Sequence, residues 1–549
     1  MKNKKITSLN RDEIISELKE EEYDLVVIGG GITGAGILID ASSRGMKVAL
    51  VEKEDFASGT SSKSSKLIHG GLRYLKQFEL SLVKEVGTER AIVHKLAPHL
   101  VIPEKMLLPL IENGSYGEWM TSIGLKVYDI LANVEGDDKR KMMNKEETLE
   151  LEPLLPEKIV KGSGYYAEYR TDDARLTIEN IKTAINYGGT PLNYTRVQDF
   201  IYANEQVKGV KVKDELSGEE YSIKSKFVIN AAGPWVDELR EVNHSKKGKQ
   251  LHLTKGVHLV FSRDKLPLKQ SVYFDIPDGR MMFAIPRGKI TYAGTTDTNY
   301  TLDKNEVRTT VEDADYLLHA INNMFPAVNL ERKDITSSWA GLRPLIHEEG
   351  KSPSELSRKD EIFISDTGLI SMAGGKLTGY RKMAERVVDK VQKKLEKETQ
   401  VDYKDVFTDK IPLTGGPWKK YKEVKKYIKK LAKDLEKYGF EPYTAWYLTT
   451  TYGKQSEQII ANFNTKTGKD IEEKLLLAEL DFCVQNEMVV TPIDFFVRRT
   501  GRLYFDIDSI KMYLERVLLE FSAIFKYSDS KIEEFRKTML SEITKHSEF

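Results

Sequence analysis

The sequence predicts an α/β fold, in which a Rossmann-like nucleotide-binding domain encloses a β-rich lobe and is followed by a helical C-terminal domain. Three observations lead to this prediction. A strand, a glycine turn, a helix and a second strand follow one another in residues 23–52. Two later segments, 226–234 and 369–375, repeat the order of apolar strand and small-residue turn, and the pattern beyond residue 400 is mostly helical. Since parallel strands are joined by crossovers, strands far along the chain can complete the sheet that begins at residue 23.

We divide the chain at the points where its composition changes. A Pro/Gly turn at 412–417 follows a polar stretch, and strand-like runs at 256–261 and 282–285 indicate a sheet in the interleaved lobe. The predicted parts are an N-terminal helix at 1–22, the nucleotide-binding region with its interleaved lobe at 23–395, and a helical domain at 400–549.

Composition excludes several classes of protein. The 549 residues carry 84 Lys and Arg against 84 Asp and Glu, and this neutral balance argues against a nucleic-acid binder. A single cysteine, Cys483, excludes an intrachain disulfide and an iron–sulfur cluster, and we predict no metal site. Residues 1–22 lack the apolar core of a signal peptide, and no run of about 18 apolar residues could span a membrane. The sequence therefore predicts a cytoplasmic protein, either soluble or peripheral on the membrane.

A dinucleotide fingerprint opens the nucleotide-binding region. In the pattern Gly29-x-Gly31-x-x-Gly34, the first glycine permits a tight turn, the second lets the backbone approach a pyrophosphate, and the third lets helix and strand pack closely. Glu52 lies 18 residues after Gly34, at the end of the second strand. A carboxylate there can accept hydrogen bonds from both ribose hydroxyls and would repel the 2′-phosphate of NADP.

The fingerprint does not separate NAD from FAD, but the next segment bears on that choice. Residues 59–71 read GTSSKSSKLIHGG, and Thr60, Ser61, Ser62 and Lys66 supply hydroxyls, backbone donors and a cation. An extended chain of this kind suits the second phosphate and the ribityl chain of a large cofactor. A solvent-exposed serine loop is the alternative.

At this point the chain resembles a known family, the FAD-dependent glycerol-3-phosphate dehydrogenases. The resemblance runs from about residue 23 to 395 and continues at 491–506 with TPIDFFVRRTGRLYFD. The matching segments occur in order along the chain: GGGITGAG at 29–36, TSSKSSKLIHGGLRYL at 60–75, YRTDDARL at 169–176, NAAGPWVD at 230–237, KGVHLVF at 255–261, GTTDT at 294–298, AGLRPL at 340–345, SRKDEI at 357–362 and GGKLTGYRKMAE at 374–385.

The resemblance implies the architecture of D-amino-acid oxidase with FAD held non-covalently. The implied reaction oxidises sn-glycerol 3-phosphate to dihydroxyacetone phosphate by hydride transfer to flavin N5, with a quinone as the next electron acceptor. The matching motifs also imply cofactor contacts for His69, Gly233, Gly375 and Thr378, and Thr378 is a plausible N-cap for the helix that follows it.

Arginines in three of these motifs are candidates for binding the substrate phosphate. Arg343 in GLRP and Arg358 in SRKD form the predicted clamp, because guanidinium groups match phosphate oxygens with two hydrogen bonds each. Arg73 in GGLRYL is a third candidate, because the sequence places it next to the flavin-binding stretch, and Tyr74 adds a hydroxyl to the same site. For any single arginine the alternative is a surface ion pair.

His258 is the predicted catalytic base, because a neutral imidazole can take the C2-hydroxyl proton as hydride leaves. It lies in an apolar run, GVHLVF, so a histidine satisfied within the core is the alternative. His69 is the rival base, although we expect it to contact FAD. Lys376 opens a strand–turn–helix segment, and the resemblance implies that this turn lies beside the flavin. Its ammonium would there stabilise negative charge near flavin N1 and O2. A lysine on an exposed turn is the alternative for that residue.

A lysine-rich segment at 418–438 raises the question of membrane binding. Apolar or aromatic residues recur at helical spacing, at 421, 424, 428, 431, 435 and 438, and nine lysines lie between 419 and 437 against three acids. Such a helix could meet an anionic membrane surface. The alternative is a domain helix whose apolar stripe packs in the core.

Three other functions stay open beside the quinone-linked dehydrogenase. The first is an oxidase of the same family, which would use O₂ and produce hydrogen peroxide. The second is a protein that binds FAD without this activity, and the third is a plain NAD dehydrogenase, in which 60–71 and 374–379 would lack a purpose. Flavin enzymes of this kind often form homodimers, so a homodimer is also expected.

Overall fold

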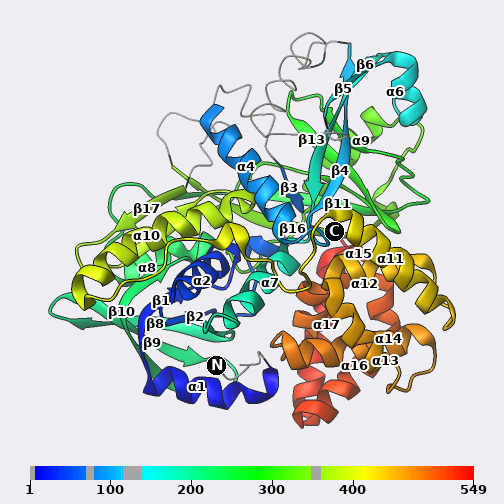
Figure 1. Cartoon of the computed structure of the whole chain (residues 1–549). Coiled ribbons are helices and arrows are strands. Elements are labelled where there is room, and N and C mark those ends of the chain that lie inside the picture. Colours follow the sequence, from blue (N-terminus) through cyan, green and yellow to red (C-terminus); the bar gives the residue numbers. More distant parts are fainter. Residues whose placement is uncertain (1–6, 70–79, 113, 115–138, 348–359) are drawn as a thin grey trace.

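The computed structural model describes residues 7–69, 80–112, 114, 139–347 and 360–549. A sheet domain with the N-terminus at its edge, a second sheet above it and a bundle of helices form the three parts visible in Figure 1. The predicted α/β architecture with a β-rich lobe and a helical C-terminal region is confirmed.

The first sheet carries the strands that the glycine turns follow. Among the described residues it has eight strands, and its main order is β17-β18-β10-β1-β2-β7, with β9 paired to β10 and β8 paired to β9. The pairs β1–β10, β1–β2, β2–β7 and β10–β18 are parallel. The strands are β1 Glu22–Ile28, β2 Val48–Val51, β7 Thr190–Leu192, β8 Thr195–Ala203, β9 Gln206–Asp214, β10 Glu220–Asn230, β17 Asp360–Ile364 and β18 Ile370–Gly374. Strands distant in sequence thus complete the sheet, as predicted.

Helices cover this sheet and set the positions of its turns. α2 contacts both α7 and α10, and these helices bury an apolar face together with the sheet. Strands β1 and β2 read as nearly continuous apolar runs because both faces of a parallel sheet are covered. The helices are α1 Arg11–Glu20, α2 Ile32–Arg44, α7 Asp173–Ile185, α8 Val236–Val242 and α10 Tyr380–Thr399.

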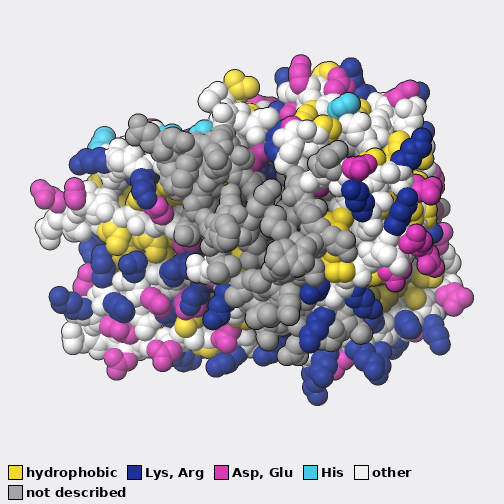
Figure 2. Space-filling model, turned by 90° about the horizontal axis from the view of Figure 1, so that it is seen from above, with side chains coloured by type: hydrophobic (Ala, Val, Ile, Leu, Met, Phe, Trp, Pro, Cys, Tyr) yellow, Lys and Arg dark blue, Asp and Glu magenta, His cyan; other side chains and the backbone are white. Residues whose placement is uncertain are grey.

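The second sheet forms the β-rich lobe. Its ten described strands run in the order β15-β11-β14-β13-β12-β4-β6-β3, with β16 on β11 and β5 on β6. The strands are β3 Leu67–Ile68, β4 Ile102–Ile111, β5 Lys141–Asn144, β6 Val160–Arg170, β11 Leu251–Ser262, β12 Ser271–Asp275, β13 Met281–Arg287, β14 Ile290–Gly294, β15 Thr298–Asn299 and β16 Ile335–Ile346. The helices of this part are α6 Lys145–Leu151 and α9 Val311–Met324, whereas α4 Leu80–Leu96 contributes Val93 and Leu96 to the core of the first sheet. From above, basic and acidic side chains are interspersed on this face around the atoms drawn in grey (Figure 2), which agrees with the zero net charge.

The C-terminal part is helical and packs against the lobe. Its helices are α11 Tyr421–Glu436, α12 Pro442–Tyr452, α13 Ser456–Phe463, α14 Ile471–Asn486, α15 Arg502–Phe505, α16 Ile507–Phe525 and α17 Asp529–Ser547, with a π-helical turn η9 at Asp494–Arg499. α15 and α17 contact β16, and one apolar core contains Tyr292 and Trp339 of the lobe together with Leu431 and Phe521 of the helices. In the part of the chain that the structure describes, no helix is both long and apolar enough to cross a bilayer.

Candidate active site

The described residues line two adjoining cavities at the carboxyl ends of the parallel strands, where ligands of open α/β sheets bind. We call the first the nucleotide cavity; among its lining residues are Gly29, Gly31, Glu52, Thr60, Gly233 and Trp235. We call the second the inner cavity; among its lining residues are Ser65, His69, His258, Arg343, Lys376 and Thr378. Thr60, Gly375 and Lys376 line both, so the two cavities meet beside β18.

The glycine turn brings backbone close to the nucleotide cavity. Gly29 has φ +111°, and a Cβ atom there would lie 2.6 Å from the Ala231 carbonyl oxygen. A Cβ atom on Gly34 would overlap the carbonyl oxygen of Gly29. Only glycine therefore allows this turn to pass between β10 and the start of α2. The first residues of α2, Ile32 and Thr33, line the cavity, and a helix N-terminus at that place would stabilise a bound pyrophosphate.

Glu52 ends β2 at the edge of the same cavity. Its Oε2 accepts a hydrogen bond from the Gly30 N–H at 2.7 Å, and its Oε1 accepts one from the Glu54 N–H at 3.0 Å. Burial raises the pKa of Glu52, although both N–H groups favour the charged form. The carboxylate is thus fixed in the position that ribose recognition requires.

The serine stretch lies between the two sheets and is not an exposed loop. Ser61 and Ser62 are buried, and the Ser61 Oγ accepts the Ile32 N–H of α2 at 2.9 Å. Thr60 donates to the Leu342 carbonyl at 2.8 Å, and Ser64 N–H donates to Asp173 at 2.9 Å. These contacts hold the segment along both cavities. The extended chain predicted from the sequence is wrong for its first residues, because Thr60–Ser62 form a 3-10 turn, η2. Ser62 lies beneath that segment and lines neither cavity.

Lys66 differs from its predicted role as a cofactor contact. Its side chain is 2% exposed, and its Nζ lies 2.5 Å from Asp173 Oδ1 and donates to the Ser62 carbonyl at 3.0 Å. The residue lines neither cavity. The Lys66 ammonium thus forms a buried ion pair with Asp173 and holds the backbone of the serine stretch from the side away from the cavities.

His258 lies on β11 at the wall of the inner cavity. Its Nε2 is 2.8 Å from the Ser65 Oγ, and its ring stacks on Trp339 with centroids 4.8 Å apart. A Cβ atom on Gly294, its partner across the sheet, would lie 2.5 Å from the His258 Cδ2, so glycine makes room for the ring. Burial lowers the pKa of His258 well below its ordinary value, and the charges of Arg343 and Lys66 add to that effect. The imidazole is therefore neutral near pH 7.

Arg343 lies on β16, opposite Thr254 of β11, and its guanidinium covers Gly256. It donates to the Thr295 Oγ1 at 2.9 Å, the Thr296 carbonyl at 3.1 Å and Asp297 Oδ1 at 3.2 Å. The GTTDT turn therefore orients this cation at the inner cavity. A Cβ atom at Gly256 would lie 2.2 Å from the Arg343 Nη2, which explains the glycine at the start of the GVHLVF run within β11.

Lys376 and its neighbours form the junction of the cavities. Lys376 comes directly before the short turn η6, Leu377–Gly379, and lines both cavities. Gly375 has φ +84°, and Thr378 donates to the His69 carbonyl at 3.4 Å. The prediction that Thr378 caps the following helix is wrong, because α10 begins at Tyr380 after Gly379 and has no side-chain cap.

Three predicted site residues lie outside the described residues: Arg73, Tyr74 and Arg358. The structure also adds residues that the sequence prediction did not single out. Trp339 stacks on His258, and Asp173 pairs with Lys66. Asp173 stands within YRTDDARL and Trp339 directly precedes AGLRPL, so both lie in or beside motifs that were recognised, but neither residue type by itself signals a site.

The arrangement defines a class of protein before any comparison. A glycine turn, an acid at the end of β2 and a polar segment that follows them line one cavity, and a neutral histidine and an oriented arginine lie in a second cavity that adjoins it. The glycine cradle and the Glu52 carboxylate fit a bound dinucleotide, and the length of the serine stretch fits its second half. The fold and the site therefore define an FAD-dependent oxidoreductase.

Comparisons with known proteins agree with this class. The family model described as FAD dependent oxidoreductase matches residues 24–381, and the model described as C-terminal domain of alpha-glycerophosphate oxidase matches residues 406–532. The chain belongs to this oxidoreductase family and, within it, to the aerobic glycerol-3-phosphate dehydrogenases. FAD is its cofactor.

The relatives cover nearly the whole chain. The aerobic glycerol-3-phosphate dehydrogenase of Bacillus subtilis (strain 168) is 50% identical over 532 residues, with 96% of each chain covered. That of Staphylococcus haemolyticus (strain JCSC1435) is 50% identical over 535 residues, covering 97% of this chain and 96% of that one. The solved structure of glycerol-3-phosphate dehydrogenase from Bacillus halodurans, complexed with FAD, is 43% identical with a TM-score of 0.84 and covers 99% of this chain and 98% of that chain.

Proposed function

We propose that this protein oxidises sn-glycerol 3-phosphate to dihydroxyacetone phosphate and delivers the two electrons to a quinone. The observation that carries the proposal is that His258 and Arg343 line the same inner cavity, which opens into the nucleotide cavity. A base and an anion-binding group are the two protein functions that oxidation of an alcohol phosphate requires. FAD, when bound, supplies the hydride acceptor at flavin N5.

Arg343 binds the phosphate of the substrate in this proposal. Its contacts with Thr295, Thr296 and Asp297 hold the guanidinium before substrate arrives, so little side-chain freedom is lost on binding. Each charge-assisted hydrogen bond to a phosphate oxygen contributes about 1.5–3 kcal/mol. From the sequence we propose the same role for Arg358, Arg73 and Tyr74, which lie outside the described residues.

His258 receives the proton of the C2 hydroxyl. Its neutral state leaves a ring nitrogen able to accept a proton, and the stacked Trp339 holds the ring in one plane. Lys376, at the junction of the cavities, stabilises negative charge that develops on the flavin side of the reaction. His69, Gly233, Gly375 and Thr378 are proposed to contact the cofactor along the cavity walls.

An oxidase is the second candidate, and one observation favours it. The C-terminal family model that matches residues 406–532 is described for alpha-glycerophosphate oxidase, whereas the full-length relatives are dehydrogenases. The two candidates share the first half of the reaction and differ in what reoxidises the flavin. The electron acceptor is therefore the feature that the experiment must resolve.

An anaerobic flavin spectrum during titration with glycerol 3-phosphate tests the proposal, with air and a soluble quinone added afterwards to separate samples. Bleaching by substrate, rapid recovery with quinone and slow recovery in air are expected. Rapid recovery in air with hydrogen peroxide would establish the oxidase. An enzyme that keeps its FAD but is not bleached would contradict the substrate and leave an FAD-binding protein without this activity.

We propose that helix α11 lies against the anionic cytoplasmic face of a membrane, where quinone is found. Val424, Leu431 and Leu435 are buried, so the apolar stripe packs in the protein, as the alternative interpretation predicted. What faces outward is a row of exposed lysines: Lys422, Lys426, Lys429 and Lys433. Attraction to acidic lipid would therefore come from charge at the surface, without insertion of the stripe.

Flotation with liposomes that contain acidic lipid tests this surface. Reversal of the four α11 lysines to Glu is expected to abolish binding at low salt. Reversal of four exposed lysines elsewhere, Lys211, Lys224, Lys511 and Lys537, is the matched control and should retain most of it. Equal binding by both variants would contradict the proposal.

The homodimer stays a prediction from the sequence, which light scattering of the purified protein would test.

A further inference from the structure

We propose that Ser65 relays the substrate proton to His258, so that the histidine acts through a serine hydroxyl rather than by direct contact with the substrate. The inference rests on the proposed oxidation of an alcohol phosphate in the inner cavity. Its first support is the 2.8 Å separation between the Ser65 Oγ and the His258 Nε2. That distance lies within the range over which a proton can be transferred.

The exposure of the two side chains supports a relay. His258 is 2% exposed, and its Nδ1 is buried and has no hydrogen-bond partner among the described residues. Its Nε2 already meets Ser65. Ser65 is half-buried and lines the inner cavity. The hydroxyl of a substrate bound in the inner cavity can therefore contact the Ser65 oxygen more readily than either ring nitrogen of His258.

A single side chain fixes both partners of the relay. The Trp339 indole stacks on the His258 ring with an interplanar angle of 12°, and its Nε1–H donates to the Ser64 carbonyl at 3.0 Å. The next carbonyl, that of Ser65, accepts the Tyr292 hydroxyl at 3.1 Å. The backbone on both sides of the serine side chain is thus held against the same wall as the imidazole. Such preorganisation is what a proton transfer between two fixed groups needs.

The charge state of His258 gives the relay its direction. A neutral imidazole whose Nε2 lone pair accepts from the Ser65 hydroxyl can take that proton, while Ser65 takes the proton of the substrate C2 hydroxyl. The O–H bond of the substrate breaks, its electron pair becomes part of the new C=O bond, and the hydride leaves C2 for the cofactor. Ser65 ends as a neutral hydroxyl and His258 as an imidazolium.

Ser65→Ala tests the relay by removing the hydroxyl while leaving the imidazole in place. The limiting rate of flavin bleaching by glycerol 3-phosphate is expected to fall by about 100-fold or more, as for loss of general acid–base catalysis. The half-saturating substrate concentration and the FAD content should stay unchanged, and Ser65→Thr, which keeps a hydroxyl, should restore most of the rate. Ser338→Ala is the matched control, because Ser338 is a buried serine of β16 whose Oγ has no partner among the described residues.

A rate for Ser65→Ala close to that of the wild type would overturn the relay and leave direct transfer to His258.

The wild-type enzyme offers a second test that needs no variant. Two protons move in the relay, so a plot of the bleaching rate against the deuterium fraction of the solvent should be curved. A linear plot would indicate transfer of a single proton and would contradict the relay. Failure of the proposed function is distinguishable, because the wild-type flavin would then not be bleached at all.

Discussion

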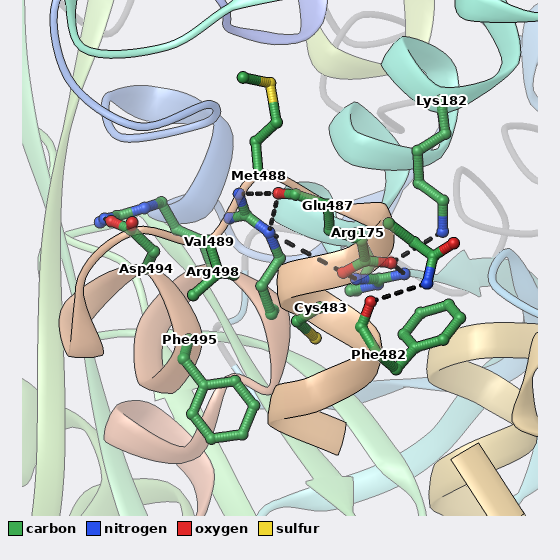
Figure 3. A network of polar contacts seen from close by, with 12 residues as sticks. Arg175, Lys182, Phe482, Cys483, Glu487, Met488, Val489, Asp494, Phe495 and Arg498 are labelled. Atoms are coloured by element: carbon green, nitrogen blue, oxygen red, sulfur yellow. Dashed lines mark hydrogen bonds and ion pairs between the residues drawn. The ribbon is translucent and has the colours of Figure 1, made fainter. Parts of the chain in front are cut away.

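Arg175 on α7 and Glu487 at the end of α14 form a buried ion pair with two contacts between the first sheet domain and the helical C-terminal part. The Nη1–Oε2 distance is 2.6 Å and the Nη2–Oε1 distance is 2.9 Å. Lys182 adds a third contact to the same carboxylate, at 2.8 Å (Figure 3). α7 also begins with Asp173, which holds Lys66 and Ser64 of the serine stretch. One helix therefore connects the helical part to the site.

Glu487→Gln is expected to destabilise the protein strongly. The substitution keeps the shape of the side chain but leaves the two buried cations, Arg175 and Lys182, to share the single carboxylate of Glu179. Removal of one partner of a buried pair costs about 3–5 kcal/mol. Thermal unfolding followed by circular dichroism should show a clearly lowered midpoint. Glu534→Gln is the control, because its partner Lys531 lies at the surface and such pairs contribute about 0–1 kcal/mol. Equal midpoints for both variants would contradict the role assigned to the pair.

The same carboxylate predicts how stability depends on pH. Burial tends to raise the pKa of Glu487, but Arg175 and Lys182 outweigh burial and hold the pKa well below its ordinary value of 4.5. Below about pH 4.5 the unfolded chain binds a proton that the folded protein does not, so stability falls as pH falls. This contribution is fully present above that pH.

Unfolding midpoints of the wild type and of Glu487→Gln, measured between about pH 3.5 and 7, check this dependence. The difference between the two proteins should be large at neutral pH and shrink as the solution becomes acidic. A difference that stays constant with pH would mean that the Glu487 charge is not what the fold uses.

The framework of the nucleotide-binding domain is predictable because its signals are local. The apolar runs at β1 and β2 predict buried strands, and the glycines between them and the small residues after β10 predict tight turns. Each of these signals depends only on neighbouring residues in the sequence. The buried charges could not be predicted in the same way. Arg499 donates to Asp55 at 2.7 Å from 444 residues away, and nothing near either residue in the sequence distinguishes this pair from surface charges. Only the fold brings such partners together.

In the candidate site, too, residues with a local sequence signal were predictable and residues whose role depends on a distant partner were not. Gly34 and Glu52 were predicted from spacing, since the geometry of a βαβ unit fixes where they lie. Lys66 shows the limit, because a lysine among serines suggests a phosphate contact, whereas the fold places Asp173 beside its ammonium. The residue type was informative, but its partner lies on a helix 107 residues away.

Arg343→Lys is expected to weaken substrate binding while FAD remains bound. A lysine cannot reproduce the forked contacts that Arg343 makes with Thr295 and Thr296 and could offer to a phosphate. Loss of one charge-assisted bond of about 1.5–3 kcal/mol raises the half-saturating glycerol 3-phosphate concentration by roughly 10–150-fold. Arg332→Lys is the control, because Arg332 is exposed and pairs with Asp315. Unchanged half-saturation in Arg343→Lys would remove this residue from the phosphate site.

Gly34→Ala is expected to abolish FAD binding, because the added Cβ atom overlaps the carbonyl oxygen of Gly29 and must push the glycine turn away from α2. The matched variant is Gly45→Ala at the other end of α2, where φ is +104° and no atom lies within 4 Å of the added Cβ. Strain at a positive φ lowers the stability of that variant by about 1 kcal/mol or more but should leave the nucleotide cavity intact. The ratio of flavin absorbance to protein in each purified variant measures the difference. Full flavin content in Gly34→Ala would show that the turn tolerates a side chain, and loss of flavin from both variants would mean that cofactor retention follows helix stability rather than the shape of the turn.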